Sequence, residues 1–327
     1  MRAAILTIGD ELTCGYRLDT NSQTIARRLA AVPLDVSLHL TVGDDMDAVQ
    51  TGLRIAMQEA EVIIAAGGLG PTEDDLTRQA VAALCDCPLI EDAEALERIR
   101  ERFAQRGRAM PERNRIQAQI PAGSQIIHND RGTAAGFYLS LNGRHLFVVP
   151  GVPDEMEGML EGFLVPRLQA LVGADQVLLR GVTKLLGPSE SEVADRIQPM
   201  LGRERNPLLG LLPHRGVIVV ELVARGATVA EAEALLSADQ AALRQLFGAA
   251  VLCQDECDLP QVTADLLQRG HWTLAVAESV DGTAGLVAAR LAEAEGSARW
   301  FRKGLVVPAG PAEAGTQALA TEARRAS

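Results

Sequence analysis

The segment 67–77 combines the residue types that phosphate and metal chemistry require. It reads Gly-Gly-Leu-Gly-Pro-Thr-Glu-Asp-Asp-Leu-Thr and follows the strand-like run Val62–Ala66. The glycines at 67, 68 and 70 allow the backbone to approach a ligand and to present amide groups to phosphate oxygens. A helix that begins after the segment adds the positive end of its dipole. Asp74 and Asp75 offer the hard oxygen ligands that a divalent cation bridging to phosphate needs. The segment therefore predicts a site for a phosphorylated ligand and a cation such as Mg²⁺.

A tight strand-to-helix connection with capping acids is the alternative interpretation of this segment. Asp is a good N-cap residue, so capping accounts for one aspartate. It does not account for three glycines, a proline, a threonine and three consecutive acids together. We therefore favour the ligand site.

Three further polar loops follow strand-like runs. They are Gly9-Asp10-Glu11, Gly43-Asp44-Asp45 and Pro150-Gly151-Val152-Pro153. Ligands of open parallel sheets bind outside the carboxyl ends of the strands, so we expect these loops to converge with segment 67–77 at one edge. Asp10 and Glu11 are site candidates that can also cap a helix, whereas helix capping is the preferred interpretation of Asp44 and Asp45.

Two other polar segments give weaker signals. Asn114 and Arg115 lie in a polar, helix-like stretch, and Arg115 is either a solvated surface charge or a group that reaches an anion from the side. His128 has no acid or nucleophile at a triad spacing, so we interpret it as a loop residue.

The elements that must position these loops alternate between strand and helix over the first ~170 residues, as in βαβ units. The predicted strands are Ala3–Ile8, Val36–Val42, Val62–Ala66, Gly136–Leu141 and His145–Val149, and Asn142-Gly143 predicts a hairpin turn between the last two. One predicted helix begins near Asn21, and three others cover Asp47–Ala60, Leu76–Leu84 and Ala93–Gln105. This order predicts an α/β domain with a doubly wound, mainly parallel sheet over residues 1–172.

Two smaller regions follow. Residues 173–256 show a strand, a helix, two strands, a helix and a strand, which predicts a small α+β domain with an antiparallel sheet. No two glycines of this region have the G-x-x-G spacing of an RNA-binding KH domain, so we assign it a structural or dimer-forming role. Residues 257–327 contain too few elements for an independent core and predict a partial α/β segment.

Composition narrows the class of protein. The formal charge of −12 argues against a nucleic-acid or membrane-surface partner, because phosphate affinity comes from Lys and Arg. Five thinly spread cysteines predict no disulfide framework, and the C-x3-C pair Cys253 and Cys257 lacks a histidine that would complete a zinc site. The chain shows no signal peptide and no apolar run of membrane-spanning length, so we expect a cytoplasmic protein.

Across its first domain the chain resembles the CinA (competence/damage-inducible) family. The matching segments, in order, are Gly9–Leu12 with Asp19-Thr20-Asn21, Val42-Gly43-Asp44, Gly67–Thr77, Asn114-Arg115 with Gln117-Ala118, Gly132-Thr133-Ala134 with Gly136-Phe137, and Pro150–Pro153 with Glu155-Met156. Gly187–Ser191 resembles the family's second domain. The resemblance implies a first domain with the molybdopterin-binding fold that hydrolyses ADP-ribose to AMP and ribose 5-phosphate with a divalent metal.

On this basis the leading hypothesis is metal-assisted attack by water on a nucleotide diphosphate. Asp74 and Asp75 would hold Mg²⁺ or a similar ion, and Glu11 would bind it or act as base. The substrate-binding residues that we predict are Gly9, Asp10, Asn21, Gly67, Gly68, Gly70, Thr72, Thr77, Asn114, Arg115, Gly132, Thr133, Pro150, Gly151 and Pro153. The expected partners are a phosphorylated, nucleotide-like small molecule and a second copy of the chain in a homodimer.

The family's third domain is a nicotinamide-mononucleotide deamidase with a serine nucleophile in Ala-Glu-Ser-Cys-Thr-Gly-Gly. Here the segment reads Ala277-Glu278-Ser279-Val280-Asp281-Gly282-Thr283. Ser279 is kept, the turn after it is not, and Pro308-Ala309 replaces a later Tyr-Ser step. We therefore expect no deamidase activity. Two alternatives for the whole chain stay open, namely molybdopterin binding with nucleotidyl transfer and a non-enzymatic dimeric scaffold.

Overall fold

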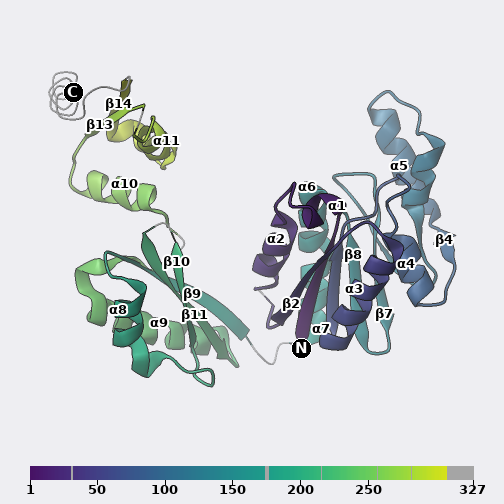
Figure 1. Ribbon diagram of the computed structural model, residues 1–327, viewed down its shortest axis with the longest axis horizontal. Helices are drawn as coiled ribbons and strands as arrows, with labels where there is room; N and C mark the ends of the chain where they lie inside the picture. Colours follow the sequence, from purple (N-terminus) through teal and green to yellow (C-terminus); the bar gives the residue numbers. More distant parts are fainter. Residues whose placement is uncertain (31, 174–176, 215, 256, 281, 308–327) are drawn as a thin grey trace. The chain divides into compact units, whose positions relative to one another are not determined.

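The computed structural model describes residues 1–30, 32–173, 177–214, 216–255, 257–280 and 282–307. The chain divides into two compact units (Figure 1). The first unit comprises Met1–Leu179 with Arg225–Ala232, and the second comprises Arg180–Ala224 with the chain from Glu233 onward. Each unit is described by itself.

A six-stranded sheet organises the first unit, with the strand order β2-β1-β3-β8-β7-β6. Its strands are β1 (Arg2–Ile8), β2 (Asp35–Val42), β3 (Val62–Ala66), β6 (Gln125–Ile127), β7 (Gly136–Leu141) and β8 (Arg144–Val149). Strand β1 pairs in parallel with β2 and β3, and β3 pairs in parallel with β8. Strand β7 runs antiparallel to β6 and β8, and the predicted Asn142-Gly143 hairpin turn has positive φ at both residues.

Helices cover both faces of this sheet, which confirms the predicted doubly wound α/β class. They are α1 (Asp10–Thr13), α2 (Thr20–Leu29), α3 (Met46–Glu59), α4 (Thr77–Leu84), α5 (Ala93–Gln105), α6 (Pro153–Met159) and α7 (Val165–Val172), with the turns η1 (Glu112–Ala118) and η2 (Leu160–Leu164). Alternate residues of β1 enter opposite cores. Ala3 and Ile5 pack with residues of α2, α6 and α7, whereas Ala4 and Leu6 pack with residues of α3 and α4.

A small lobe beside the sheet was not predicted. Strands β4 (Leu89–Glu91) and β5 (Gln119–Pro121) form a two-stranded antiparallel sheet. Helix α5 packs there through Ala95, Leu96 and Ile99. Three-residue strands carry too little alternation to be recognised in a sequence.

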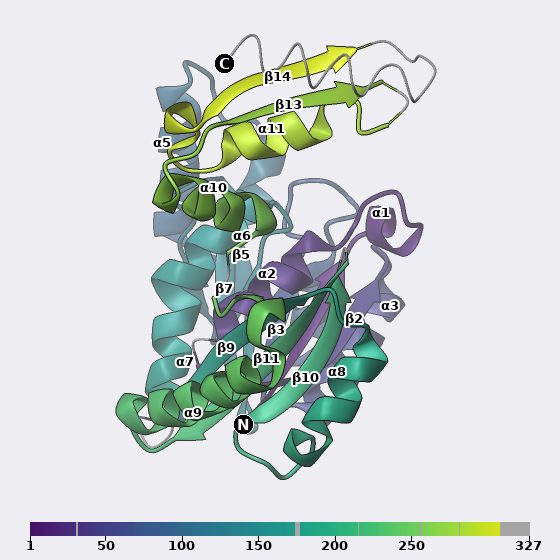
Figure 2. The ribbon, with the colours of Figure 1, turned by 90° about the vertical axis from the view of Figure 1, so that its left-hand side faces the viewer.

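The second unit is built on a four-stranded sheet with the order β10-β11-β9-β12. Its elements follow the predicted βαββαβ order: β9 (Val177–Leu186), α8 (Glu190–Ile197), β10 (Leu208–His214), β11 (Val217–Gly226), α9 (Val229–Phe247) and β12 (Val251–Cys253). Burial alternates along β11, and helices α8 and α9 lie on the same side of the sheet (Figure 2). The short turns η3 (Gln198–Met200) and η4 (Gly248–Ala250) follow α8 and α9, and Pro199, which has no amide hydrogen to donate, lies in η3 just after α8.

The last described segment contains α10 (Leu259–Arg269), β13 (Leu274–Ser279), α11 (Leu286–Glu293), η5 (Ser297–Arg299) and β14 (Phe301–Val307). Strands β13 and β14 pair in parallel, and a small core joins Ala264, Leu291 and Trp300. Strand β14 was not predicted as an element. Among the described residues, no helix has both the length and the hydropathy that a membrane span requires.

Candidate functional site

The four predicted loops lie at one edge of the first-unit sheet. They follow β1, β2, β3 and β8, which are neighbours in the sheet and mutually parallel. Backbone hydrogen bonds join them directly, because the Gly9 amide donates to Val42 O (3.0 Å) and the Gly67 amide donates to Val149 O (3.1 Å). The structure therefore brings these polar segments together as the strand pattern predicted.

Carboxylates crowd this edge. The Asp10 amide donates to Asp44 Oδ2 (2.8 Å), and the Asp44 amide donates to Asp10 Oδ1 (3.1 Å). Burial raises the pKa of Asp44, and the negative charges of Asp10, Glu11 and Asp74 raise it further, against the lowering effect of the Asp10 amide. A bound cation would stabilise the ionised form of the Asp44 carboxylate.

The interpretation of Asp44 as a helix cap was wrong, whereas that of Asp45 is confirmed. Asp45 is the N-cap of α3, and its Oδ1 accepts hydrogen bonds from the amides of Asp47 and Ala48, each at 3.0 Å. Asp44 lies one residue earlier and is held by the Asp10 amide instead. The sequence carried a signal for this contact at Gly43, where an added Cβ would lie 2.5 Å from Asp10 Oδ1.

The glycines of the β3–α4 loop serve close packing against the protein itself. Gly67 and Gly68 have φ values of 119° and 63°. An added Cβ would lie 2.2 Å from Ile8 O at Gly67 and 2.2 Å from Thr77 Oγ1 at Gly68. The buried Thr77 hydroxyl donates to Gly67 O (2.9 Å) and closes the loop. Substitution of either glycine would therefore displace the loop.

The predicted cradle of amides from Gly67 to Gly70 is only half available. The Gly67 amide donates to Val149 O and the Gly70 amide donates to Asp75 Oδ1 (2.6 Å). Among the described residues, no acceptor takes the amides of Gly68 and Leu69. Two amides of this loop, rather than four, can therefore face an anion.

Asp75 closes the loop and is not a helix cap. Its carboxylate accepts from the amides of Gly70 (2.6 Å) and Thr72 (2.9 Å) and from the Thr72 hydroxyl (2.5 Å). Helix α4 begins at Thr77 with Leu76 as its N-cap residue. Asp74 is exposed. A metal-binding role for Asp74 and Asp75 stays a prediction.

Sequence reasoning missed Arg78. Its side chain is fully buried beneath the loop, where Nη2 donates to Leu69 O (2.5 Å) and Nη1 to Gly70 O (3.4 Å). Burial lowers the pKa of Arg78 to about 10, and the charge of Asp75 opposes this effect, so the guanidinium stays charged at neutral pH. The sequence signal for the burial of Arg78 is its position in the first turn of a helix whose alanines are buried.

Asn21 and the β8–α6 turn close the opposite side of the site. Asn21 Nδ2 donates to Gly151 O (2.7 Å), while its buried Oδ1 has no partner among the described residues. A Cβ at Gly151 would lie 3.4 Å from Gly67 Cα, so this turn packs against the glycine loop. Pro150 ends the buried strand and Pro153 is the first residue of α6. A buried acceptor without a donor is consistent with a ligand that supplies one.

Four predicted substrate-binding residues have other partners. Asn114 is buried and donates to Gln117 Oε1 (2.9 Å), which is a structural contact. Arg115 forms ion pairs with Glu91 and Glu112 on the surface of the small lobe, as the solvated-charge interpretation predicted. Gly132 lies against Glu155, and an added Cβ would meet its carboxylate at 2.0 Å.

Thr133 completes that set of four. It lines a small pocket with Arg98, His128 and Asn129. The structure therefore places Thr133 beside α5 and joins none of the four residues to the acidic edge by a hydrogen bond.

The third segment has a different arrangement around Ser279. Glu278, buried beside it, accepts from the amides of Val287 (3.0 Å) and Ala288 (2.7 Å) in the first turn of α11. Although burial raises the pKa of Glu278, hydrogen bonds from Thr283, Ala288 and Val287 hold it below its usual value. Asp281 and the Pro308-Ala309 pair lie outside the described residues.

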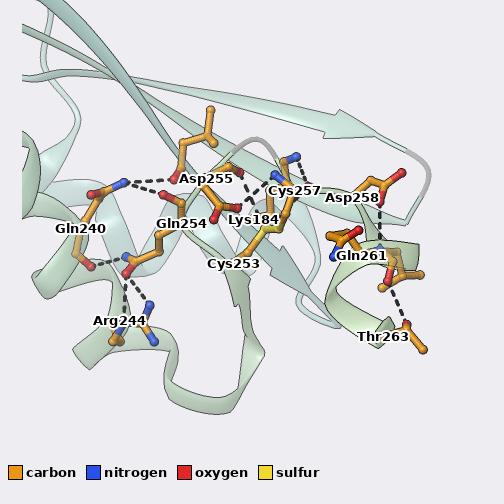
Figure 3. The surroundings of a disulfide bond; sticks show 12 residues. Lys184, Gln240, Arg244, Cys253, Gln254, Asp255, Cys257, Asp258, Gln261 and Thr263 are labelled. Carbon is orange, nitrogen blue, oxygen red and sulfur yellow. Dashed lines mark hydrogen bonds between the residues drawn. A yellow bond between two sulfur atoms is a disulfide. The ribbon is translucent and has the colours of Figure 1, made fainter. Parts of the chain in front are cut away.

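Among the described residues, the cysteines form one local disulfide rather than a framework across the fold. Cys253 and Cys257 form a disulfide between β12 and α10 (Figure 3), whereas Cys14, Cys85 and Cys87 are free. The spacing argument considered a framework across the fold, but a pair four residues apart needs only a tight local turn.

Sequence comparison identifies three known domains along the chain. Residues 4–170 match the family described as "Probable molybdopterin binding domain". Residues 180–252 match the "Damage-inducible protein CinA KH domain" although they lack the G-x-x-G spacing of RNA-binding KH domains, and residues 256–312 match the "CinA C-terminal domain".

Full-length relatives carry the same family name. A CinA-like protein of Dictyoglomus thermophilum is 36% identical over 306 residues, which cover 94% of this chain and 74% of the relative. A CinA-like protein of Frankia casuarinae is 37% identical over 314 residues, covering 94% and 72%. Among solved structures, the protein CinA from Thermoplasma acidophilum is 31% identical, with a TM-score of 0.48 over 51% of this chain and 97% of that chain.

Proposed function

Because the chain belongs to the CinA family, we propose that its first unit is a metal-dependent hydrolase of a nucleotide diphosphate, with ADP-ribose as the substrate. The observation that carries this proposal is the group of carboxylates from Asp10, Glu11, Asp44 and Asp74, next to the glycine loop. A diphosphate and an acidic edge repel each other unless a cation lies between them.

The donor set fits a hard divalent cation. Carboxylate oxygens are the ligands that Mg²⁺ prefers, and the charges of Asp10, Glu11 and Asp74 raise the pKa of Asp44 in the absence of a counter-charge. Asp10, Glu11, Asp44 and Asp74 would hold the ion, and Asp75 would join them only by releasing Thr72. When bound, such an ion lowers the pKa of a water molecule and neutralises phosphate charge.

The residues of the loop would act on the substrate. The Gly68 and Leu69 amides can donate to phosphate oxygens, and the buried guanidinium of Arg78 keeps the loop carbonyls in place. Asn21 Oδ1 can accept a hydrogen bond from a substrate hydroxyl. Glu11, a carboxylate in the short helix α1 that follows β1, is the general base of this proposal.

The test is a product assay on the pure full-length protein. Incubation with ADP-ribose and Mg²⁺ should give AMP and ribose 5-phosphate, and an excess of chelator should abolish AMP release until Mg²⁺ is restored. AMP release that continues in excess chelator would contradict the metal-assisted mechanism.

A second candidate keeps the site and changes the reaction. The family match over residues 4–170 describes molybdopterin binding, which is compatible with a pterin phosphate on the same loop. Tight binding of molybdopterin with no AMP release from ADP-ribose would favour this candidate. Ligand binding without any turnover would favour the non-enzymatic dimeric scaffold.

A further inference from the structure

The turn between β12 and α10 gathers three metal-ligating side chains outside the first unit. The ligand atoms of Cys253, Asp255 and Cys257 lie within 4.8 Å of one another. Figure 3 shows these three residues around the sulfur atoms, at the end of the sheet. Both cysteines are partly exposed and Asp255 is exposed, so ions can reach the group from solvent.

The start of this turn is fixed by helix α9. Gln254 Nε2 donates to Gln240 O (2.6 Å), and Gln240 Nε2 donates to Gln254 O (3.1 Å). Arg244 donates to Gln254 Oε1 through Nε (2.9 Å) and Nη2 (2.6 Å). The residue between Cys253 and Asp255 therefore has little freedom, and its side chain points away from the sulfurs (Figure 3).

The end of the turn is fixed from β9 and α10. Lys184 Nζ donates to Cys257 O (2.5 Å), and the Cys257 amide donates to Asp255 Oδ1 (3.0 Å). Asp258 then caps α10 by accepting from the Gln261 amide (3.0 Å). A ligand set held on both sides by regular structure loses little entropy when it binds an ion.

We propose that Cys253, Asp255 and Cys257, with both thiols reduced, bind a thiophilic divalent cation such as Zn²⁺. Two thiolates and a carboxylate are common zinc ligands, and three protein ligands leave one coordination position open. The Cα atoms of the two cysteines are 6.8 Å apart. That separation accommodates sulfurs about 3.8 Å apart, as a tetrahedral site with Zn–S bonds of about 2.3 Å requires.

The disulfide and the cation exclude each other, since each uses both sulfur atoms. Binding of Zn²⁺ to the two thiols releases two protons. Formation of the disulfide removes two protons and two electrons from the thiols, and hydrogen peroxide that accepts them is reduced to two molecules of water. The site therefore binds metal only in the reduced state.

The experiment titrates Zn²⁺ into the reduced full-length protein against a chromophoric chelator, with Mg²⁺ in excess to occupy the oxygen ligands of the first unit. The reduced protein should bind one equivalent of Zn²⁺, and the peroxide-oxidised protein should bind none at this site. Cys253→Ser and Cys257→Ser should abolish the binding, and Asp255→Asn should weaken it by about tenfold or more. Co²⁺ in place of Zn²⁺ should give thiolate charge-transfer absorption that the serine variants lack.

Cys85→Ser/Cys87→Ser is the matched control. That pair also flanks an aspartate, Asp86, but in the described part of the chain these three residues form no group of ligand atoms. The control variant should bind Zn²⁺ as the parent does, and thermal melts of all variants should show that each is folded. Zn²⁺ binding that survives Cys253→Ser or peroxide oxidation, or no binding by the reduced parent, would overturn the proposal.

Discussion

Two segments of this chain connect a parallel strand to a helix through small and acidic residues, and they use their acids differently. Near the end of β13, Glu278 accepts from the amides of Val287 and Ala288 and so binds the first turn of helix α11. After β3, Asp75 is also taken up by amides, whereas Asp44, after β2, accepts from the Asp10 amide and is close enough to the charges of Asp10, Glu11 and Asp74 for them to raise its pKa. A carboxylate held by amides stabilises a turn, whereas a carboxylate such as Asp44, whose pKa is raised by burial and by neighbouring negative charges, is poised for a cation.

Asp44 provides the largest test of this distinction. Asp44→Asn removes a charge from the proposed cation site while it keeps the size of the side chain. AMP release from ADP-ribose should fall about 100-fold or more, the scale of losing ~3 kcal/mol of transition-state stabilisation. The measurement is kcat/KM with Mg²⁺ at saturation.

Its neighbour is the control. Asp45 caps α3, and Asn caps a helix about as well as Asp, so Asp45→Asn should leave both activity and melting temperature unchanged. Equal activity of Asp44→Asn and the parent would remove Asp44 from the site.

Asp75 tests the other kind of carboxylate, which is held by backbone amides and stabilises a turn. Asp75→Asn replaces an oxygen that accepts from Gly70 or Thr72 with an amino group, which leaves donors facing a donor. The free energy of unfolding should fall by about 1–3 kcal/mol. Activity should fall by about tenfold as the loop loosens, and urea denaturation and the AMP assay measure the two effects.

Glu73, an exposed acid of the same loop, is the matched position. Glu73→Gln should change neither quantity. If Asp75→Asn were as stable as the parent and its activity fell 100-fold or more, Asp75 would be a cation ligand rather than a loop residue.

The sequence predicted the sheet and its edge well because their signals are local. Val62–Ala66 is a continuous apolar run, and glycines and acids follow it directly. The partners of each acid were not predictable, since Asp44 and Asp10 lie 34 residues apart and meet only through strand pairing. The burial of Arg78 likewise depends on tertiary packing rather than on spacing.

The stability of Asp44→Asn should depend on pH, with a smaller effect. The folded state raises the pKa of Asp44 above its unfolded value, so ionisation of Asp44 destabilises the fold. This cost is absent below the unfolded pKa and is complete once the pH exceeds the folded pKa. At pH 7 the free energy of unfolding of Asp44→Asn should therefore exceed that of the parent by no more than about 1 kcal/mol. Below about pH 3.5 the two free energies of unfolding should be equal. If Asp44→Asn were less stable than the parent at pH 7, the ionised carboxylate of Asp44 would stabilise the fold through attractive interactions.

We expect the third segment, residues 257–327, to have no deamidase activity toward nicotinamide mononucleotide. Both carboxylate oxygens of Glu278 accept amides of the N-terminal turn of α11, which holds the side chain toward that helix. The glycine-rich turn that follows the serine in the family is also replaced, since Val280 and Asp281 occupy it. A serine nucleophile needs an adjacent base and donors for the developing oxyanion, and residues 280–283 do not keep the family's sequence for the turn after the serine.

Ammonia release from nicotinamide mononucleotide should therefore stay at the background level of a protein-free control, and Ser279→Ala should give the same trace. AMP release from ADP-ribose by Ser279→Ala should equal that of the parent, which shows that the preparation is active and that the two segments work independently. Ammonia release by the parent that disappears in Ser279→Ala would instead show that the third segment is an active deamidase. The β13–α11 connection would then have a reactive role, as we propose for the acidic edge of the first unit, rather than a structural one.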